Sequence, residues 1–342
     1  MQALFATGEP LNPLEFREAP SPQLLDPTDA IIEPIAVAAC DLDRSIVSGR
    51  SPFPGSFMLG HEFTGRIVGL GENTGNLALG DIVLASFQPS CGQCHHCGHA
   101  HSSVCASVPN GTMYGIGETG GSWNGALAER VRVPWAEFNL VKLPAELDPV
   151  VIASASDNIA DGVRCIANAL AQRPDASILI AGSGSIPLYA LAYAKFMGVE
   201  QITVASRDAF VLNTANQLGA HCLSVEQWPK RFDDHDITVD CTNEIEGLSA
   251  VLKSTSPYGH CTSASIFFGR DIPVPMFNLN MRGITFSTGR VNSASAMHDV
   301  IGLLQRGFDP EVINPTYAAF SDCISAFSDE PFSRKLIIHS IS

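Results

Sequence analysis

The amino-acid sequence predicts an α/β protein with two domains, one of them a doubly wound parallel sheet. The chain has 342 residues, too many for one ordinary core, and 45% of them are hydrophobic, enough for two cores. From residue 177, "SILIAGSGSIPLYALAYAKFMGVEQITVASRD" has the pattern of a buried strand, a glycine-rich turn, a helix and a second strand. Further α/β units follow at 236–255, 259–266 and 282–292, and alternating strands and helices favour a parallel sheet.

Composition excludes several classes of partner. Charged residues make up only 16% of the chain and the net charge is −15, without basic clusters, so we expect neither nucleic acid nor an anionic membrane as partner. No apolar run reaches the ~18–20 residues of a membrane-spanning helix. The first residues lack a basic segment followed by an apolar one, as a signal peptide would have. We therefore expect a cytoplasmic protein with reduced cysteines.

Four cysteines lie close together in "CGQCHHCGHAHSSVC". Four thiolates can close a tetrahedron around zinc and leave no open position, so this segment predicts a structural zinc site. A reduced compartment disfavours disulfides, and a nucleic-acid zinc ribbon usually has two separated knuckles and a basic face. The interspersed histidines are expected to be solvated, although one could be a stray ligand. The predicted ligands are Cys91, Cys94, Cys97 and Cys105.

A cysteine, a histidine and carboxylates in separate segments are candidates for a second metal site. Cys40 follows the strand-like run "AIIEPIAVAA", His61 and Glu62 follow "FPGSFMLG", and Asp157 lies at a predicted helix start. Such a set can hold zinc and keep one position open for a substrate. Sequence spacing alone does not bring these residues together.

The glycine-rich turn predicts a pyrophosphate site, because backbone N–H groups and the dipole of the following helix attract an anion. Gly182 and Gly184 fit the first two glycines of G-x-G-x-x-G, and Ser185 and Ile186 follow them. Pro187 replaces the third glycine; proline is tolerated in the first turn of a helix, but the glycine that permits close helix–strand packing is lost.

The end of the second strand predicts which dinucleotide binds. NAD enzymes usually have Asp or Glu there, for the ribose 2′-hydroxyl. Ser206 is uncharged and Arg207 can pair with a phosphate, which favours NADP over NAD. In the alternative interpretation, Arg207 is an ordinary surface charge and Asp208 acts as the acidic residue.

The chain resembles the medium-chain, zinc-dependent alcohol dehydrogenases over essentially its whole length. "GHEFTGRIVGLG" resembles their zinc signature G-H-E-x2-G-x5-G, and the cysteine cluster resembles their structural-zinc lobe, here 88–108. The resemblance implies that Cys40, His61 and Asp157 hold a catalytic zinc, with Glu62 beside it or exchanging as a ligand. Two zinc ions per chain are therefore expected.

The resemblance also implies the domains and the assembly. A GroES-like catalytic domain is expected at 1–152 and 292–342, and a Rossmann dinucleotide-binding domain at 153–291, with the active site in the cleft between them. We expect a homodimer or homotetramer.

The implied reaction is hydride transfer between NADP(H) and an alcohol, aldehyde or ketone, with zinc as Lewis acid. The sequence departs from the family where the proton relay begins, since Leu42 replaces Ser or Thr and Ser45 replaces His. Asp43, Ser45 and Asp161 are possible substitutes. For Asp43 the alternative is a structural hydrogen-bond acceptor, and Asp161 lies where the family often has Thr beside the nicotinamide.

The sequence says less about the substrate pocket and about which kind of bond is reduced. Family positions imply an apolar pocket for a small hydrophobic or aromatic substrate. Two other functions stay open: reduction of C=C or C=N bonds by NADPH, and a non-catalytic nucleotide-binding protein. The predicted pocket residues are Leu42, Phe87, Trp123 and Asn158.

Overall fold

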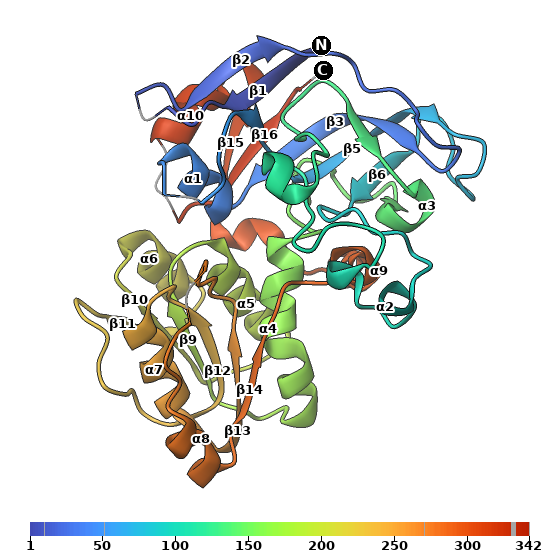
Figure 1. Cartoon of the computed structure of the whole chain (residues 1–342). Coiled ribbons are helices and arrows are strands. Elements are labelled where there is room, and N and C mark those ends of the chain that lie inside the picture. Colours follow the sequence, from blue (N-terminus) through green and yellow to red (C-terminus); the bar gives the residue numbers. More distant parts are fainter. Residues whose placement is uncertain (10, 51, 270, 330–332, 342) are drawn as a thin grey trace. The chain divides into compact units, whose positions relative to one another are not determined.

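The computed structural model describes residues 1–9, 11–50, 52–269, 271–329 and 333–341, and the chain divides into two compact units (Figure 1). Unit 1 contains Met1–Ala160, Val291–Asp309 and Pro315–Ser342; unit 2 contains Asp161–Arg290 and Pro310–Asn314. The first division falls after Ala160 and not after residue 152. One reason is that Ala153 packs against Ile337 and two other alanines of unit 1.

Unit 2 contains a six-stranded sheet in the order β11-β10-β9-β12-β13-β14, and all neighbouring strands are parallel. β9, "ILIAG", is buried along its whole length, which is typical of a strand covered on both faces. The prediction of a doubly wound parallel sheet is confirmed. The strands are β9 (Ile178–Gly182), β10 (Ile202–Ser206), β11 (His221–Ser224), β12 (His235–Cys241), β13 (Thr255–Ser263) and β14 (Thr285–Thr288). The helices are α4 (Asn158–Gln172, which starts in unit 1), α5 (Ser185–Phe196), α6 (Ala209–Gln217), α7 (Ile245–Lys253), α8 (Met276–Arg282) and the 3₁₀ turn η3 (Pro310–Ile313).

The strand order of unit 2 reverses at β9. The chain proceeds outward from β9 to β10 and β11 and then returns with β12 to the other side of β9. Right-handed crossovers in the two directions place their helices on opposite faces of the sheet. Ligands of doubly wound sheets bind at the carboxyl ends of the strands beside such a reversal. Gly182 and Cys241 lie at these two ends, paired in register.

Unit 1 is mainly β. Its larger sheet has the order β15-β16-β3-β5-β6-β8, with β7 paired to β3, and its smaller sheet has the order β2-β1-β4. Apolar side chains from both ends of the chain, among them Ile32, Phe63 and Leu336, share one core. The strands are β1 (Gln2–Ala6), β2 (Leu14–Glu18), β3 (Ala30–Ala39), β4 (Phe57–Met58), β5 (Glu62–Leu70), β6 (Ile82–Ala85), β7 (Val131–Val133), β8 (Leu140–Lys142), β15 (Thr316–Ala319) and β16 (Leu336–His339).

The helices of unit 1 are short, apart from α9. None of the helices in the described part of either unit is long and apolar enough to span a membrane. The helices are α1 (Asp41–Val47), α2 (His95–Gly98), α3 (Ala136–Asn139), α9 (Ser293–Gln305) and α10 (Cys323–Asp329), with 3₁₀ turns η1 (Ser102–Val104), η2 (Gly117–Gly120) and η4 (Phe320–Asp322).

Three adjacent strands of unit 1 bring distant residues to one end of the larger sheet. β16 and β5 flank β3 and run antiparallel to it, with Leu336 opposite Ala39 and Glu62 opposite Ala38. The residues just beyond these pairs therefore meet at the same end. They are Cys40 after β3, His61 before β5 and Lys335 before β16.

Candidate metal centres and nucleotide-binding site

Cys40 lies at the junction of β3 and α1 and is the N-cap residue of that helix. Its Sγ accepts a hydrogen bond from the Leu42 N–H at 3.2 Å, and Asp43 Oδ2 accepts one from the Cys40 N–H at 2.9 Å. This reciprocal cap is local, between residues 40 and 43. It fixes the thiol at the end of the sheet.

The second predicted metal site is assembled in unit 1. One ligand atom from each of Cys40, His61, Glu62 and Asp157 lies within 4.8 Å of all the others, and we call this group the Cys–His–carboxylate cluster. His61 Nε2 lies 3.3 Å from Asp157 Oδ2, yet neither nitrogen of the buried ring has a hydrogen-bond partner among the described residues. Because thiolate, imidazole and carboxylate are zinc donors, these residues fit a zinc ion.

The protonation of Cys40 and His61 would change if a cation bound beside them. Burial raises the pKa of Cys40 to about 12, although His61 opposes the rise. Burial lowers the pKa of His61, but the charges of Asp43 and Cys40 outweigh burial and hold it well above its usual value. A cation would favour thiolate and neutral imidazole, so metal binding here releases protons.

Glu62 is held by two residues that the sequence did not indicate. The buried Lys335 ammonium lies 2.6 Å from Glu62 Oε1 and donates to Asn158 Oδ1 at 2.8 Å. Ser154 Oγ donates to Glu62 Oε2. Burial raises the pKa of Glu62 to about 7, although Lys335 opposes the rise. Glu62 is thus a restrained member of the cluster and not a free carboxylate.

The residues considered for proton transfer lie in different surroundings. Asp43 is fully buried, and its Oδ1 lies 3.4 Å from His61 Nδ1 while its Oδ2 receives the Cys40 N–H. These contacts favour the structural interpretation of Asp43. Leu42 and Ser45 are half-buried on α1. In unit 2, Asp161 is buried and its Oδ1 lies 2.5 Å from Arg164 Nε.

The predicted pocket residues have different contacts. The Phe87 ring lies beside His61, with centroids 5.7 Å apart, as a wall of the site would. Asn158 is buried and its amide oxygen accepts from Lys335. Trp123 Nε1 donates to Thr112 Oγ1 at 3.2 Å. Of these residues, Phe87 therefore has the geometry that best suits a wall of the substrate pocket.

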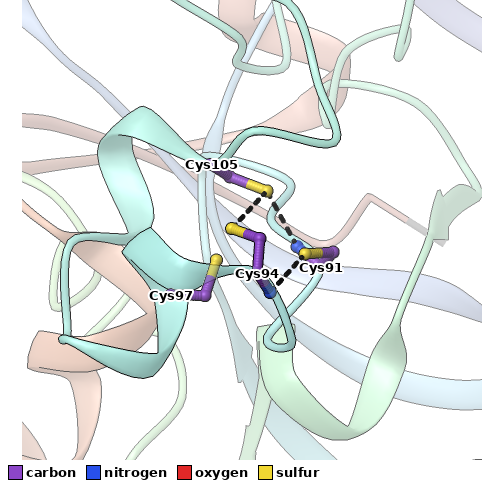
Figure 2. A group of neighbouring side chains, drawn as sticks. All are labelled: Cys91, Cys94, Cys97 and Cys105. Atoms are coloured by element: carbon purple, nitrogen blue, oxygen red, sulfur yellow. Dashed lines mark hydrogen bonds between the residues drawn. The ribbon is translucent and has the colours of Figure 1, made fainter.

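The four clustered cysteines form a second group, with sulfur atoms within 4.8 Å of one another (Figure 2). Backbone N–H groups point at these sulfurs, as from Cys94 to Cys91 Sγ at 3.4 Å and from Ala106 to Cys94 Sγ at 3.4 Å. The N–H groups of Cys97 and Ala106 lower the pKa of Cys94 to about 6, whereas burial raises the pKa values of Cys97 and Cys105. N–H donors that favour thiolate fit a tetrahedral zinc site. The interspersed histidines His95, His96, His99 and His101 are exposed.

The glycine turn of unit 2 has the conformation that a pyrophosphate site requires. Gly182 and Gly184 have φ values of 132° and 104°, which other residues rarely adopt, and a Cβ at Gly182 would clash with the Cys241 backbone. α5 begins directly afterwards at Ser185, with Ile186 and Pro187 in its first turn. The N–H groups of its first turn therefore point toward the carboxyl edge of the sheet.

The residues after β10 make local contacts that bear on both interpretations of Asp208. Asp208 Oδ1 caps α6 by accepting from Phe210 N at 2.8 Å, and the buried Ser206 Oγ accepts from Asp208 N at 3.1 Å. Asp208 thus has a structural role. Arg207 Nη1 forms an ion pair with Glu244 Oε1 at 2.6 Å. Arg207 is thus paired with a carboxylate at the carboxyl edge of the sheet.

Comparison with known proteins agrees with this arrangement. Residues 26–145 match the family model of the alcohol dehydrogenase GroES-like domain. The glutathione-independent formaldehyde dehydrogenase of Pseudomonas aeruginosa is 28% identical over 81% of this chain and 71% of the relative. Zinc-type alcohol dehydrogenase B of Aspergillus flavus is 25% identical over 87% of this chain and 72% of the relative. The structure of alcohol dehydrogenase TADH from Thermus sp. ATN1 superposes with a TM-score of 0.90, at 25% identity over 99% of both chains.

Residues 26–145 belong to the alcohol dehydrogenase GroES-like domain family, and over most of its length the chain is similar to zinc-type alcohol dehydrogenases. It is an oxidoreductase, and the expected GroES-like domain is confirmed by the family match within unit 1. Zinc-type alcohol dehydrogenases are among these relatives, and both clusters of unit 1 offer donor atoms that zinc prefers.

The sequence did not indicate three residues of these sites. Lys335 precedes an apolar strand, Ser154 lies in a loop and Glu244 follows β12, and none belongs to a motif. Glu62 offered the only signal in the sequence, because a carboxylate expected at the start of a buried strand needs a partner. The presence of a buried carboxylate does not say which cationic side chain pairs with it.

Proposed function

We propose that this chain transfers a hydride between NADP(H) and a small alcohol, aldehyde or ketone, using a zinc ion held by Cys40, His61 and Asp157. The observation that carries the proposal is the convergence of these three side chains from separate segments within 4.8 Å. When bound, zinc would polarise the substrate oxygen as a Lewis acid, and the dinucleotide would donate or accept the hydride.

The chain's own residues would orient this chemistry. Asp43 lies behind the His61 ring and fixes its rotation, as carboxylates behind metal-binding histidines do. Lys335 and Ser154 hold Glu62 beside the cluster, where it can act as a further donor. Phe87 covers one side of His61 and excludes water there.

We assign the remaining binding roles by unit. Unit 1 is proposed as the catalytic domain, with a structural zinc on the four clustered cysteines. Unit 2 is proposed as the cofactor domain, with Gly182, Gly184, Ser185 and Ile186 against the pyrophosphate. Ser206 and Arg207 support NADP over NAD, because one lacks a repelling charge and the other can pair with a phosphate. Asp161 is proposed beside the nicotinamide on family position alone.

The test combines metal removal with turnover. Zinc-loaded protein should reduce aliphatic or aromatic carbonyl compounds with NADPH, lose this activity to a zinc chelator and regain it when zinc is returned. NADPH binding without turnover across such a panel would instead support a non-catalytic nucleotide-binding protein. Activity unaffected by complete removal of zinc would contradict the proposal.

A second candidate reaction is reduction of a C=C or C=N bond. Leu42 favours it, because an apolar side chain carries no exchangeable proton where the resemblance implies Ser or Thr. An enal separates the two reactions: the allylic alcohol as product supports carbonyl reduction, and the saturated aldehyde supports C=C reduction.

We also propose a homodimer or homotetramer. β14 is an edge strand of its sheet, and exposed apolar side chains occur in the segments around it. Exposed patches of this kind are typical of interfaces. The examples are Tyr258, Met276, Phe277 and Met281. Light scattering after size-exclusion chromatography would test this, and a monomer at micromolar concentration would contradict it.

A further inference from the structure

The ion pair between Arg207 and Glu244 joins two segments at the carboxyl edge of the sheet in unit 2. Arg207 directly follows β10, and Glu244 follows β12. Both strands pair with β9, on opposite sides, and β9 ends in Gly182. The ion pair therefore connects the two segments that flank the glycine turn, beside the reversal in strand order where doubly wound sheets bind ligands.

Arg207 is held by two contacts. Its Nη1 lies 2.6 Å from Glu244 Oε1, and its guanidinium carbon lies 5.1 Å from the centre of the Trp228 ring. An aromatic face attracts and orients a guanidinium group. The side chain is therefore positioned before any ligand arrives, with a carboxylate as its partner.

Two neighbouring polar residues at this strand end make local contacts. Asp208 caps α6, and Ser206 accepts the Asp208 N–H and lies 3.1 Å from Ser183 Oγ. Glu244 is the carboxylate that pairs with Arg207 in this structure. A 2′-phosphate carries about −1.5 to −2 charges and three acceptor oxygens, whereas a 2′-hydroxyl carries no charge.

We propose that Glu244 competes with the 2′-phosphate of NADP(H) for Arg207 and is a specificity-determining residue of this enzyme. This inference rests on the proposed function of unit 2 as the dinucleotide domain. The phosphate replaces Glu244 as the partner of Arg207 and is repelled by the carboxylate that it displaces. A dinucleotide with a free 2′-hydroxyl leaves the ion pair in place, so Glu244 weakens the preference for NADP(H) over NAD(H).

The exposure of the pair sets the size of the effect. The side chains of Arg207 and Glu244 are 39% and 42% exposed, so water screens their attraction and the pair opens readily. Glu244→Gln keeps the shape of the side chain and removes its charge. We expect it to tighten binding of a 2′-phosphorylated ligand about three- to tenfold and to leave binding of the unphosphorylated ligand unchanged.

The probes are 2′,5′-ADP and 5′-AMP, titrated calorimetrically into the full zinc-loaded chain at fixed ionic strength. These fragments contain only the adenosine end of the dinucleotide, so they measure binding at that end without hydride transfer. Glu246→Gln is the matched control, because it removes one exposed negative charge from the adjacent turn. It should change neither affinity appreciably. In an Arg207→Ala background, Glu244→Gln should lose its effect on 2′,5′-ADP.

Each outcome has a distinct meaning. An unchanged ratio of the two affinities in Glu244→Gln overturns the inference and leaves the proposed function standing. Weaker 5′-AMP binding in that variant also overturns it, because Glu244 would then hold the ribose 2′-hydroxyl of NAD(H). Wild-type protein that binds neither probe nor either intact dinucleotide contradicts the proposed function itself, and the inference with it.

Discussion

The Lys335 ammonium lies 2.6 Å from Glu62 Oε1, and both side chains are fully buried. Removing one member of a buried pair leaves an uncompensated charge, whereas replacing both by apolar residues is often neutral. Lys335→Met should therefore lower the free energy of unfolding by about 3–5 kcal/mol, measured by urea denaturation. The double variant Glu62→Leu/Lys335→Met should recover most of the loss. A double variant as unstable as Lys335→Met would show that the charge balance is not the cause.

The two proposed zinc sites should empty independently, because their ligands come from different segments of unit 1. Asp157→Ala removes one donor of the Cys–His–carboxylate cluster and leaves the four clustered cysteines intact. We expect zinc content to fall from about two ions per chain to about one, with loss of carbonyl reduction and a near-normal circular dichroism spectrum. Asp148→Asn, an exposed carboxylate, is the control. Full zinc content in Asp157→Ala would refute the ligand assignment.

The four cysteines and not the neighbouring histidines should hold the structural zinc. Cys94→Ser removes a thiolate that accepts the Ala106 N–H, so we expect loss of about one zinc per chain and faster proteolysis within 88–108. His95→Gln alters an exposed ring and should retain both ions. Zinc loss in His95→Gln would show that this histidine is a ligand after all. Mass spectrometry of the cleavage products locates the sites of proteolysis.

Asp236 should make unit 2 less stable as the pH becomes acidic. Burial raises its pKa, but the Ser177 N–H, the hydroxyls of Ser256 and Ser177, and Arg173 together lower it below the usual value. A lowered carboxyl pKa stabilises the fold above the unfolded-state pKa, and this stabilisation is lost as pH falls through the folded-state pKa.

Asp236→Asn should therefore cost about 1–2 kcal/mol at pH 7, and the difference from wild type should shrink below about pH 4. Urea denaturation at several pH values measures this difference. Asp233→Asn, an exposed neighbour, is expected to have little effect at any pH. A difference for Asp236→Asn that does not change with pH would rule out ionisation as its source.

The parts of the fold and site that depend on short segments were predictable from the sequence. The cysteine spacing indicated a thiolate cluster, and the glycines after β9 indicated a turn that requires positive φ. Cys40 and His61 are separated in sequence but flank neighbouring antiparallel strands, so the family motif identified a pair that spacing alone could not.

Long-range electrostatic partners were not predictable. Lys335 meets Glu62 only because β16 pairs with β3, and Glu244 meets Arg207 only because β12 returns to the opposite side of β9 from β10. Neither contact has a periodicity or a local spacing that marks it. Asp43 is the opposite case. Its side chain accepts a hydrogen bond from the N–H of Cys40, three residues earlier, and a search for helix N-termini can detect such a local contact.

The position of β16 beside β3 also bears on biosynthesis. All four clustered cysteines have been translated once residue 105 is made, so this group can take up its ion while most of the chain is still unmade. The Cys–His–carboxylate cluster keeps its buried Glu62 uncompensated until Lys335 has emerged from the ribosome. We therefore expect the proposed structural zinc site to fill before the proposed catalytic zinc site during synthesis.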